Sequence, residues 1–188
     1  MAAKSNLVNM VLCLTLVCLV CGGLLGAVNS VTEDIIAETA QKNLVASIAA
    51  VLPEGGELSE SQTSDAAGIG EYYVLSTDGA PVAYAVKSTT NGFGGALTLM
   101  VGVLPDGTVY NTSVLEHSET PGLGAKCTEE ESLFRTQFKG FKGRLAVKKD
   151  GGDLDAITAS TITSRAFTLA VKQAVELVSS LNGGQDNE

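Results

Sequence analysis

The 188-residue chain has no tryptophan and one histidine, and only 5% of its residues are aromatic. It is also short of positive charge, with 12 lysines and arginines against 21 aspartates and glutamates, for a formal net charge of −9. Proteins that bind nucleic-acid phosphates need a basic face, so this balance argues against nucleic acid as a partner. With one histidine and no second Cys-x-x-Cys pair, the sequence predicts no metal site.

Cysteine is scarce and clustered. Cys13, Cys18 and Cys21 lie in one apolar run, and Cys127 is alone. This arrangement is unlike a disulfide scaffold, whose paired cysteines are spread over the domain. Cys18 and Cys21 form a Cys-x-x-Cys motif, which is typical either of a redox or metal site or of two small apolar residues in a helix.

Charge is absent between Lys4 and Glu33. As a helix, the apolar residues 7–28 would extend about 33 Å, enough to cross a hydrocarbon core of ~30 Å. The run is long for a signal peptide and lacks a small-x-small cleavage site, so we expect an uncleaved membrane anchor. Lys4 precedes the run and acidic residues follow it. The positive-inside rule therefore predicts a cytoplasmic N-terminus and an extracytoplasmic remainder.

Three regions are predicted: an anchor at residues 1–30, a helix with a flexible acidic loop at 31–70, and a domain at 71–188. Thr32 is a candidate N-cap for a helix that Pro53 ends, although this helix could also continue directly from the span. Residues 54–70 are rich in glycine, serine and acid, which is typical of a flexible loop.

Short runs typical of β-strands fill the third region. Residues 72–76 and 81–87 flank an Asp78-Gly79 turn, the signature of a hairpin. Further strands are expected at 96–103, 108–115 and 143–148, and a final amphipathic helix at 163–181. The mixture predicts an α+β fold with a small, mostly antiparallel sheet and packed helices.

Three irregular, glycine- or hydroxyl-rich stretches are candidates for binding: residues 91–95, 117–126 and 155–164. The third comes directly before the final helix, whose first N–H groups and dipole favour an anion such as phosphate. An ordinary Ser/Thr N-cap is the alternative. The stretch lacks the glycine pattern and lysine of a P-loop. His117 is an acid–base candidate by residue type, but a lone histidine is more often structural.

The second and third stretches carry a resemblance. HSETPGLGAK followed by DAITASTITS, behind one N-terminal span, resembles the G subunit of the Rnf-type ion-translocating electron-transport complexes. NGFGGALTLMVGVLPDGTV is similar to the family's central strand pair. The C subunit of the sodium-pumping NADH:quinone reductase is a relative of that family. The resemblance covers essentially the whole chain.

The resemblance implies FMN held covalently, as a phosphoester to a threonine hydroxyl, by a flavin transferase that uses FAD and Mg²⁺ and releases AMP. The family's attachment pattern is Asp, two residues, Ser or Thr, Gly or Ala, Ala or Ser, then the acceptor Thr. Its counterparts here are Asp155, Thr158, Ala159, Ser160 and Thr161, which makes Thr161 the expected acceptor. Ser160 and Thr163 are alternative acceptors. The TAST form departs mildly from the family's commonest SGAT form.

The resemblance also implies which residues lie beside the flavin: Glu119, Thr120, Gly122, Leu123 and Gly124, with Phe93, Gly94 and Gly95 completing the pocket. It implies an electron-carrying protein that has no catalytic residues of its own. This protein relays electrons inside a membrane complex that couples electron flow between ferredoxin and NAD⁺ to Na⁺ or H⁺ movement. The alternatives are the quinone-reductase C subunit and an anchored scaffold or binding protein without a cofactor.

Overall fold

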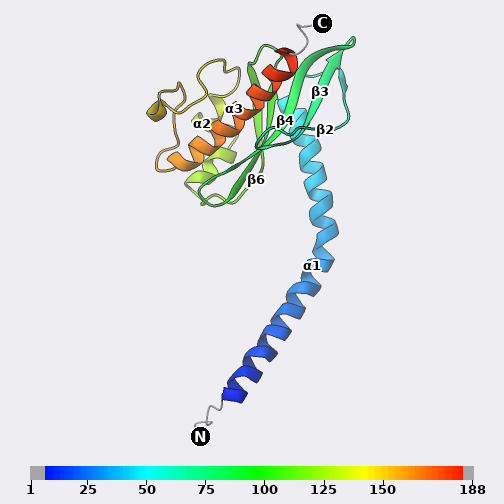
Figure 1. Ribbon diagram of the computed structural model, residues 1–188, viewed down its shortest axis with the longest axis vertical. Coiled ribbons are helices and arrows are strands. Elements are labelled where there is room, and N and C mark those ends of the chain that lie inside the picture. The colour runs from blue at the N-terminus through cyan, green and yellow to red at the C-terminus, as the bar shows by residue number, and fades with distance from the viewer. Residues whose placement is uncertain (1–6, 184–188) are drawn as a thin grey trace. The chain divides into compact units, whose positions relative to one another are not determined.

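The computed structural model describes residues 7–183, and the chain divides into two compact units, residues 1–43 and 44–188. Helix α1 (Leu7–Val51) forms the described part of the first unit and ends in the second (Figure 1). Its most apolar window has a mean hydropathy of 2.6, and none of that window is buried. By length and composition α1 therefore fits a single-pass membrane anchor.

Thr32 does not begin a new helix. Its hydroxyl donates to the carbonyl oxygen of Val28, one turn back within α1, at 3.0 Å. The expectation of a cap at Thr32 was wrong, and the alternative of a helix continuous with the apolar run is confirmed. The helix ends at Val51, two residues before Pro53, because the proline ring restricts the backbone of the residue before it and lacks an N–H.

The second unit is built on one antiparallel sheet in the order β1-β3-β4-β5-β6, with β2 also paired to β3. The strands are β1 (Glu57–Leu58), β2 (Gln62–Thr63), β3 (Ile69–Thr77), β4 (Ala80–Asn91), β5 (Ala96–Val103) and β6 (Val109–His117). The predicted Asp78-Gly79 hairpin joins β3 to β4, with a left-handed backbone at both turn residues.

Alternating side chains on the central strands bury both faces of this sheet. Leu97, Leu99 and Val101 of β5 face helix α3 (Thr161–Gly183), which lies across the sheet in Figure 1. On the opposite face, Met100 packs with Val51 from the end of α1. Successive side chains of a strand point to opposite faces, so a strand between two apolar layers needs apolar residues on both. The predicted α+β fold is confirmed.

A long connection between β6 and α3 carries short helices: η1 (Gly124–Thr128), α2 (Leu133–Thr136) and η2 (Lys148–Asp150). Phe134 and Phe138 of this connection meet Phe167 of α3, with ring centroids 5.2 and 4.9 Å from it. Such buried aromatic clusters contribute through both their area and their ring geometry. They fix the connection against the start of α3, where the binding stretches meet.

Two local expectations were wrong. Residues 54–70 contain β1 and β2, which pair with β3 instead of forming only a loop. Residues 143–148 form no strand, because their backbone groups bond within their own loop: Lys148 N donates to Leu154 O at 2.7 Å, and Ala146 N donates to Arg144 O at 2.8 Å. Apolar alternation over six residues looks the same in both situations.

Candidate functional site

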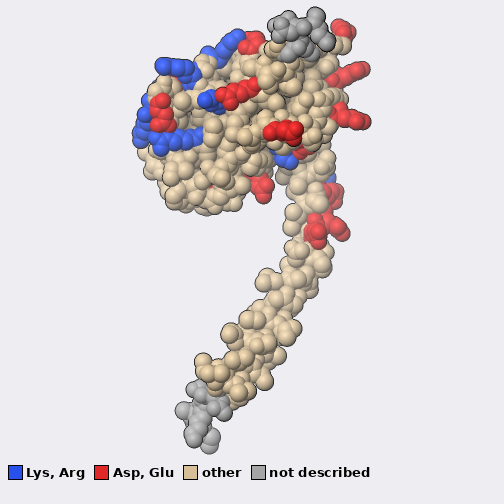
Figure 2. Space-filling view, in the orientation of Figure 1, with Lys and Arg blue, Asp and Glu red and all other residues tan. Residues whose placement is uncertain are grey.

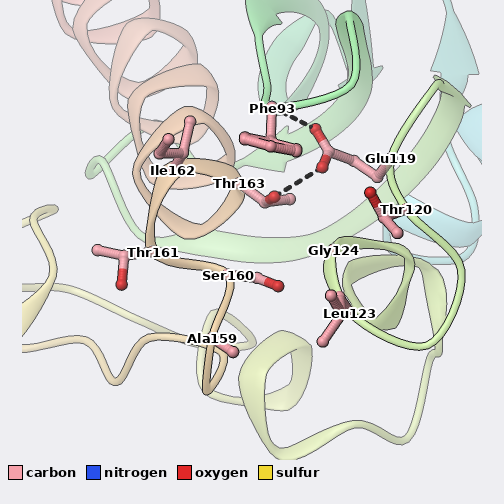
Figure 3. Close-up of a pocket in the computed structure, with 10 residues that line it drawn as sticks. All are labelled: Phe93, Glu119, Thr120, Leu123, Gly124, Ala159, Ser160, Thr161, Ile162 and Thr163. Carbon is pink, nitrogen blue, oxygen red and sulfur yellow. Dashed lines mark hydrogen bonds between the residues drawn. The ribbon is translucent and has the colours of Figure 1, made fainter.

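A pocket of about 350 Å³ lies where three separated segments meet. The segments are the loop between β4 and β5, the turn that follows β6, and the first turn of α3. Figure 3 shows the ten lining residues: Phe93, Glu119, Thr120, Leu123, Gly124, Ala159, Ser160, Thr161, Ile162 and Thr163. All three irregular stretches of the sequence therefore contribute to one cavity.

Glu119 ties these three segments together. Its side chain is only 5% exposed. Oε1 accepts from the backbone N–H of Phe93 at 2.7 Å and of Gly94 at 3.4 Å, and Oε2 accepts from the Thr163 hydroxyl at 2.7 Å (Figure 3). Hydrogen bonds to a buried carboxylate are among the stronger ones in proteins. Glu119 thus holds the β4–β5 loop against the start of α3.

The glycines beside Glu119 are explained by this contact. A Cβ at Gly92 would run into Glu119 Oε1, and one at Gly124 would lie 2.8 Å from Thr163 Oγ1. A Cβ at Gly94 would collide with the backbone carbonyl of Ser118, which cannot move as a side chain can. Glycine is therefore needed at these positions for close approach of the chain to itself.

The start of α3 is fixed by a local hydrogen-bond loop. The buried Ser164 hydroxyl accepts from Ile157 N at 2.9 Å and donates to Ser160 O at 2.9 Å. The first hydrogen bond of α3 runs from Ser164 N to Ser160 O. The backbone N–H groups of Thr161, Ile162 and Thr163 precede it and therefore have no partner within the helix. They face the pocket end of the helix, where its dipole favours negative charge.

The three hydroxyl-bearing residues here differ in accessibility. Thr163 is 1% exposed and its hydroxyl is bonded to Glu119, while Ser160 is 8% exposed. Thr161 is half-buried and lines the pocket from its rim. Thr161 is thus the least buried of the three residues.

Ala159 has a left-handed backbone, with φ of +63°. A residue with a Cβ is strained there by roughly 1 kcal/mol, whereas glycine is not. Ser160 N then donates to Ile157 O at 3.0 Å and closes the turn. This left-handed residue turns the chain into α3 with Ser160 inward and Thr161 at the rim.

The Ala159→Gly variant is expected to raise the free energy of unfolding slightly, by about 0.5 kcal/mol, because relief of strain outweighs the added entropy of the unfolded chain. Ala159→Val is expected to lower it by about 1–2 kcal/mol, since a β-branched side chain tolerates this conformation poorly. Urea unfolding followed by tyrosine fluorescence measures both. A stabilised valine variant would contradict the assigned backbone geometry.

The pocket walls fit a flat, partly apolar ligand with an anionic end. Phe93, Leu123 and Ile162 keep 69%, 44% and 51% of their surfaces exposed around the pocket. Apolar side chains left open on several sides of a cavity are typical of ligand sites. The N–H groups at the start of α3 can bind a phosphate group at the anionic end of such a ligand. The residues present therefore fit FMN.

The structure brings most of the predicted site residues into this pocket. Gly94, Gly95 and Gly122 do not line it. Asp155 and Thr158 line an adjacent pocket instead. Sequence reasoning missed Ile162 as a wall of the pocket. The available signal was its place directly after Thr161, on the exposed side of the first helical turn.

Two reactive residue types lie outside the pocket lining. His117 is exposed, and its Nδ1 accepts from Glu119 N at 3.2 Å. Burial, reinforced by the nearby Glu119 carboxylate, raises the pKa of the Cys127 thiol to about 11. Cys127 therefore remains a protonated thiol at neutral pH and packs as part of the core.

Among residues 7–183, no group of side chains is arranged to hold a metal ion.

Comparisons with known proteins agree with this geometry. The model of the RnfG N-terminal region matches residues 1–51, and that of the FMN-binding domain matches residues 92–176, which contain all three pocket segments. The fold and site thus define an FMN-binding domain behind an N-terminal apolar helix.

Relatives make the assignment more specific. The chain is 34% identical to the G subunit of the proton-translocating ferredoxin:NAD(+) oxidoreductase complex of Clostridium ljungdahlii, over 92% of this chain and 91% of that protein. It is 41% identical to the G subunit of the ion-translocating oxidoreductase complex of Escherichia coli, over 81% of each. The chain belongs to the G-subunit family of the Rnf-type complexes.

A solved structure is also similar. The crystal structure of the C subunit of the Na(+)-translocating NADH-quinone reductase from Parabacteroides distasonis has a TM-score of 0.45 and 28% identity. The match covers 58% of this chain and 64% of that one.

Proposed function

We propose that this chain is a membrane-anchored flavoprotein that carries FMN as a phosphoester on Thr161 and relays electrons within an Rnf-type ion-translocating ferredoxin:NAD⁺ oxidoreductase. In domain terms, residues 1–30 are the anchor, 31–70 connect it, and 71–188 form the flavin domain. The relatives named above are subunits of such complexes, so its partners are the other membrane subunits and, during maturation, a flavin transferase.

The observation that carries the proposal is the position of Thr161. It is the least buried of the three hydroxyl-bearing residues at the start of α3, and it lines a pocket with apolar walls. The N–H groups next to it favour the single negative charge that a phosphodiester retains. Ser160 and Thr163 are more buried, which supports Thr161 over both as the acceptor.

The residues of this chain would have three separate tasks. FMN, when bound, supplies the capacity to accept and release electrons. Phe93, Leu123 and Ile162 would shield part of the flavin ring from water, and the start of α3 would hold the phosphate. Glu119 touches the loop behind Phe93 and would set the position of that wall. Covalent attachment prevents loss of a cofactor that could not easily be replaced outside the cytoplasm.

The orientation of the anchor follows from the charges that flank it. Lys4 precedes the apolar run, and Glu33, Asp34 and Glu38 follow it, which favours a cytoplasmic N-terminus and an extracytoplasmic flavin domain. Protease added to intact spheroplasts should then remove the domain. Full protection under conditions that digest a known extracytoplasmic protein would contradict this orientation.

The proposal is tested by the intact mass of the full chain, produced with and without a flavin transferase. With the transferase, we expect a gain of one FMN minus one water and flavin fluorescence that persists after denaturation. Peptide mapping should place the added mass on Thr161. An unmodified mass beside an active transferase would refute covalent FMN and favour a scaffold without cofactor. The identity of the copurifying subunits separates the Rnf-type complex from the quinone reductase.

A further inference from the structure

A second pocket, of about 370 Å³, borders the attachment segment. It is lined by Lys148, Lys149, Asp155, Ala156, Ile157, Thr158, Ala159 and Thr161. Thr161 and Ala159 also line the first pocket, so the attachment segment separates two cavities. The first has apolar walls, whereas two lysines from η2 line the second. These lysines come before the attachment pattern in sequence.

The lysines belong to a basic region on an acidic protein. Figure 2 shows the lysine and arginine side chains gathered at the end of the domain where Figure 1 places α2. Residues 139–165 contain six basic and three acidic side chains, whereas the chain as a whole has a net charge of −9. The basic residues are Lys139, Lys142, Arg144, Lys148, Lys149 and Arg165. Basic side chains are therefore gathered in the segment that contains the attachment pattern; Lys142, Arg144, Lys148 and Arg165 are in ion pairs.

Contacts from outside the attachment pattern hold this region in place. The Gln137 side chain accepts from Asp155 N at 2.7 Å and donates to Asp155 O at 2.9 Å. Arg165 of α3 donates through two nitrogens to both carboxylate oxygens of Asp150, each at 2.7 Å. Such bidentate pairs fix orientation as well as distance. The attachment segment is thus presented in one folded conformation next to η2.

The two lysines differ in their partners. Lys148 Nζ lies 2.7 Å from Asp155 Oδ2, and both side chains are mostly exposed. Within the described residues 7–183, none of the ion pairs includes Lys149. Lys149 therefore brings to the pocket that contains Thr161 a positive charge that no ion pair holds, although that charge also acts on the nearby Asp150 carboxylate.

We propose that this lysine-lined pocket receives the pyrophosphate of the flavin dinucleotide while FMN is transferred to Thr161. The inference rests on the proposed function. Recognition of the attachment segment would then depend on Lys148 and Lys149, which lie outside it in sequence.

The transfer itself needs positive charge at this place. The Thr161 Oγ–P bond forms as the P–O bond to the bridging oxygen breaks, AMP leaves with that oxygen, and the hydroxyl proton passes to solvent. Negative charge grows on the leaving phosphate during this step. Lysine ammonium groups stabilise such developing charge, and they do so more strongly in the transition state than in the ground state.

The test is the rate of covalent flavin incorporation into the full chain in detergent micelles, with purified flavin transferase, FAD and Mg²⁺. Lys148→Ala/Lys149→Ala is expected to lower kcat/KM for the chain about tenfold or more, with a clear fall in kcat. The single Lys149→Ala variant, which breaks no ion pair, should account for much of this loss. Lys148→Arg/Lys149→Arg should retain most of the rate, because it keeps both charges.

A matched control removes the same charge elsewhere. Lys42 and Lys172 are exposed, lie outside the basic region and line neither pocket, so Lys42→Ala/Lys172→Ala should stay within about twofold of wild type. An equal loss in this control would overturn the inference in favour of a general charge effect. A rise in KM with unchanged kcat would overturn it in favour of docking of the transferase itself. Wild-type rates in the Lys148→Ala/Lys149→Ala variant would refute it while modification of Thr161 stands.

Discussion

Thr161→Val is expected to abolish covalent flavin on this chain. Valine keeps the β-branched shape of threonine but has no hydroxyl, so no phosphoester can form at this position. The loss should be complete rather than partial, since Ser160 is buried and the Thr163 hydroxyl is bonded to Glu119. Flavin fluorescence of the denatured chain and its intact mass measure the result directly.

Three control variants make this experiment specific. Thr163→Ala and Ser160→Ala should both remain modified, at reduced rates if the start of α3 is disturbed. Thr161→Ser should be modified to some extent, because the nucleophilic oxygen is kept. Undiminished modification of Thr161→Val would move the acceptor to another residue, with Ser160 the next to test. Equal urea unfolding midpoints of the threonine and valine proteins would exclude misfolding as the cause of a loss.

Glu119→Ala is expected to lower the free energy of unfolding by about 2–4 kcal/mol and to weaken the flavin pocket. The substitution removes the acceptor of two backbone N–H groups and of the Thr163 hydroxyl. Buried donors that lose their partner cost roughly 1–3 kcal/mol each, and Thr163 can recover part of this by bonding within its helix. Urea unfolding followed by tyrosine fluorescence suits a protein without tryptophan.

Glu119→Gln is the matched variant for this prediction. Its amide oxygen can still accept from Phe93 N, and its amide nitrogen can donate to Thr163 Oγ1, so a loss of only about 1 kcal/mol is expected. A flavin-loaded Gln variant should also differ from wild type in midpoint potential, because a negative charge near the flavin has been removed. Equal stability of the alanine and wild-type proteins would refute the bridging role of Glu119.

The central hairpins could be predicted because their signals are local. The Asp78-Gly79 turn and the alternating residues of β5 depend only on neighbours in sequence. The strand expected at 143–148 failed for the opposite reason. Whether its backbone pairs with the sheet depends on distant segments, and here the loop closes on Leu154 instead. The continuity of α1 through Thr32 could not be predicted either, because a residue type that is suited to cap a helix does not by itself start a new one.

The candidate site divides in the same way. The attachment pattern ending at Thr161 is a linear motif, so Thr161 could be predicted as the acceptor from sequence alone. The role of Glu119 as a bridge between Phe93 and Thr163 could not be predicted from the sequence, because Glu119 lies 26 and 44 positions away from these two residues. Lys148 and Lys149 have no pattern of their own, and only the folding of η2 against the attachment segment brings them beside Thr161.

The sequence by itself determined the apolar helix, the α+β class, the family and the expected chemistry of each glycine-rich stretch, since hydropathy, turn residues and motifs act over short distances. Only the tertiary structure decided that the three stretches form one pocket, that Thr161 is more accessible than Ser160 and Thr163, and that a basic pocket lies on the other side of the attachment segment. The physical reason is that burial and charge proximity are set by packing between residues far apart in the chain, which no local pattern encodes.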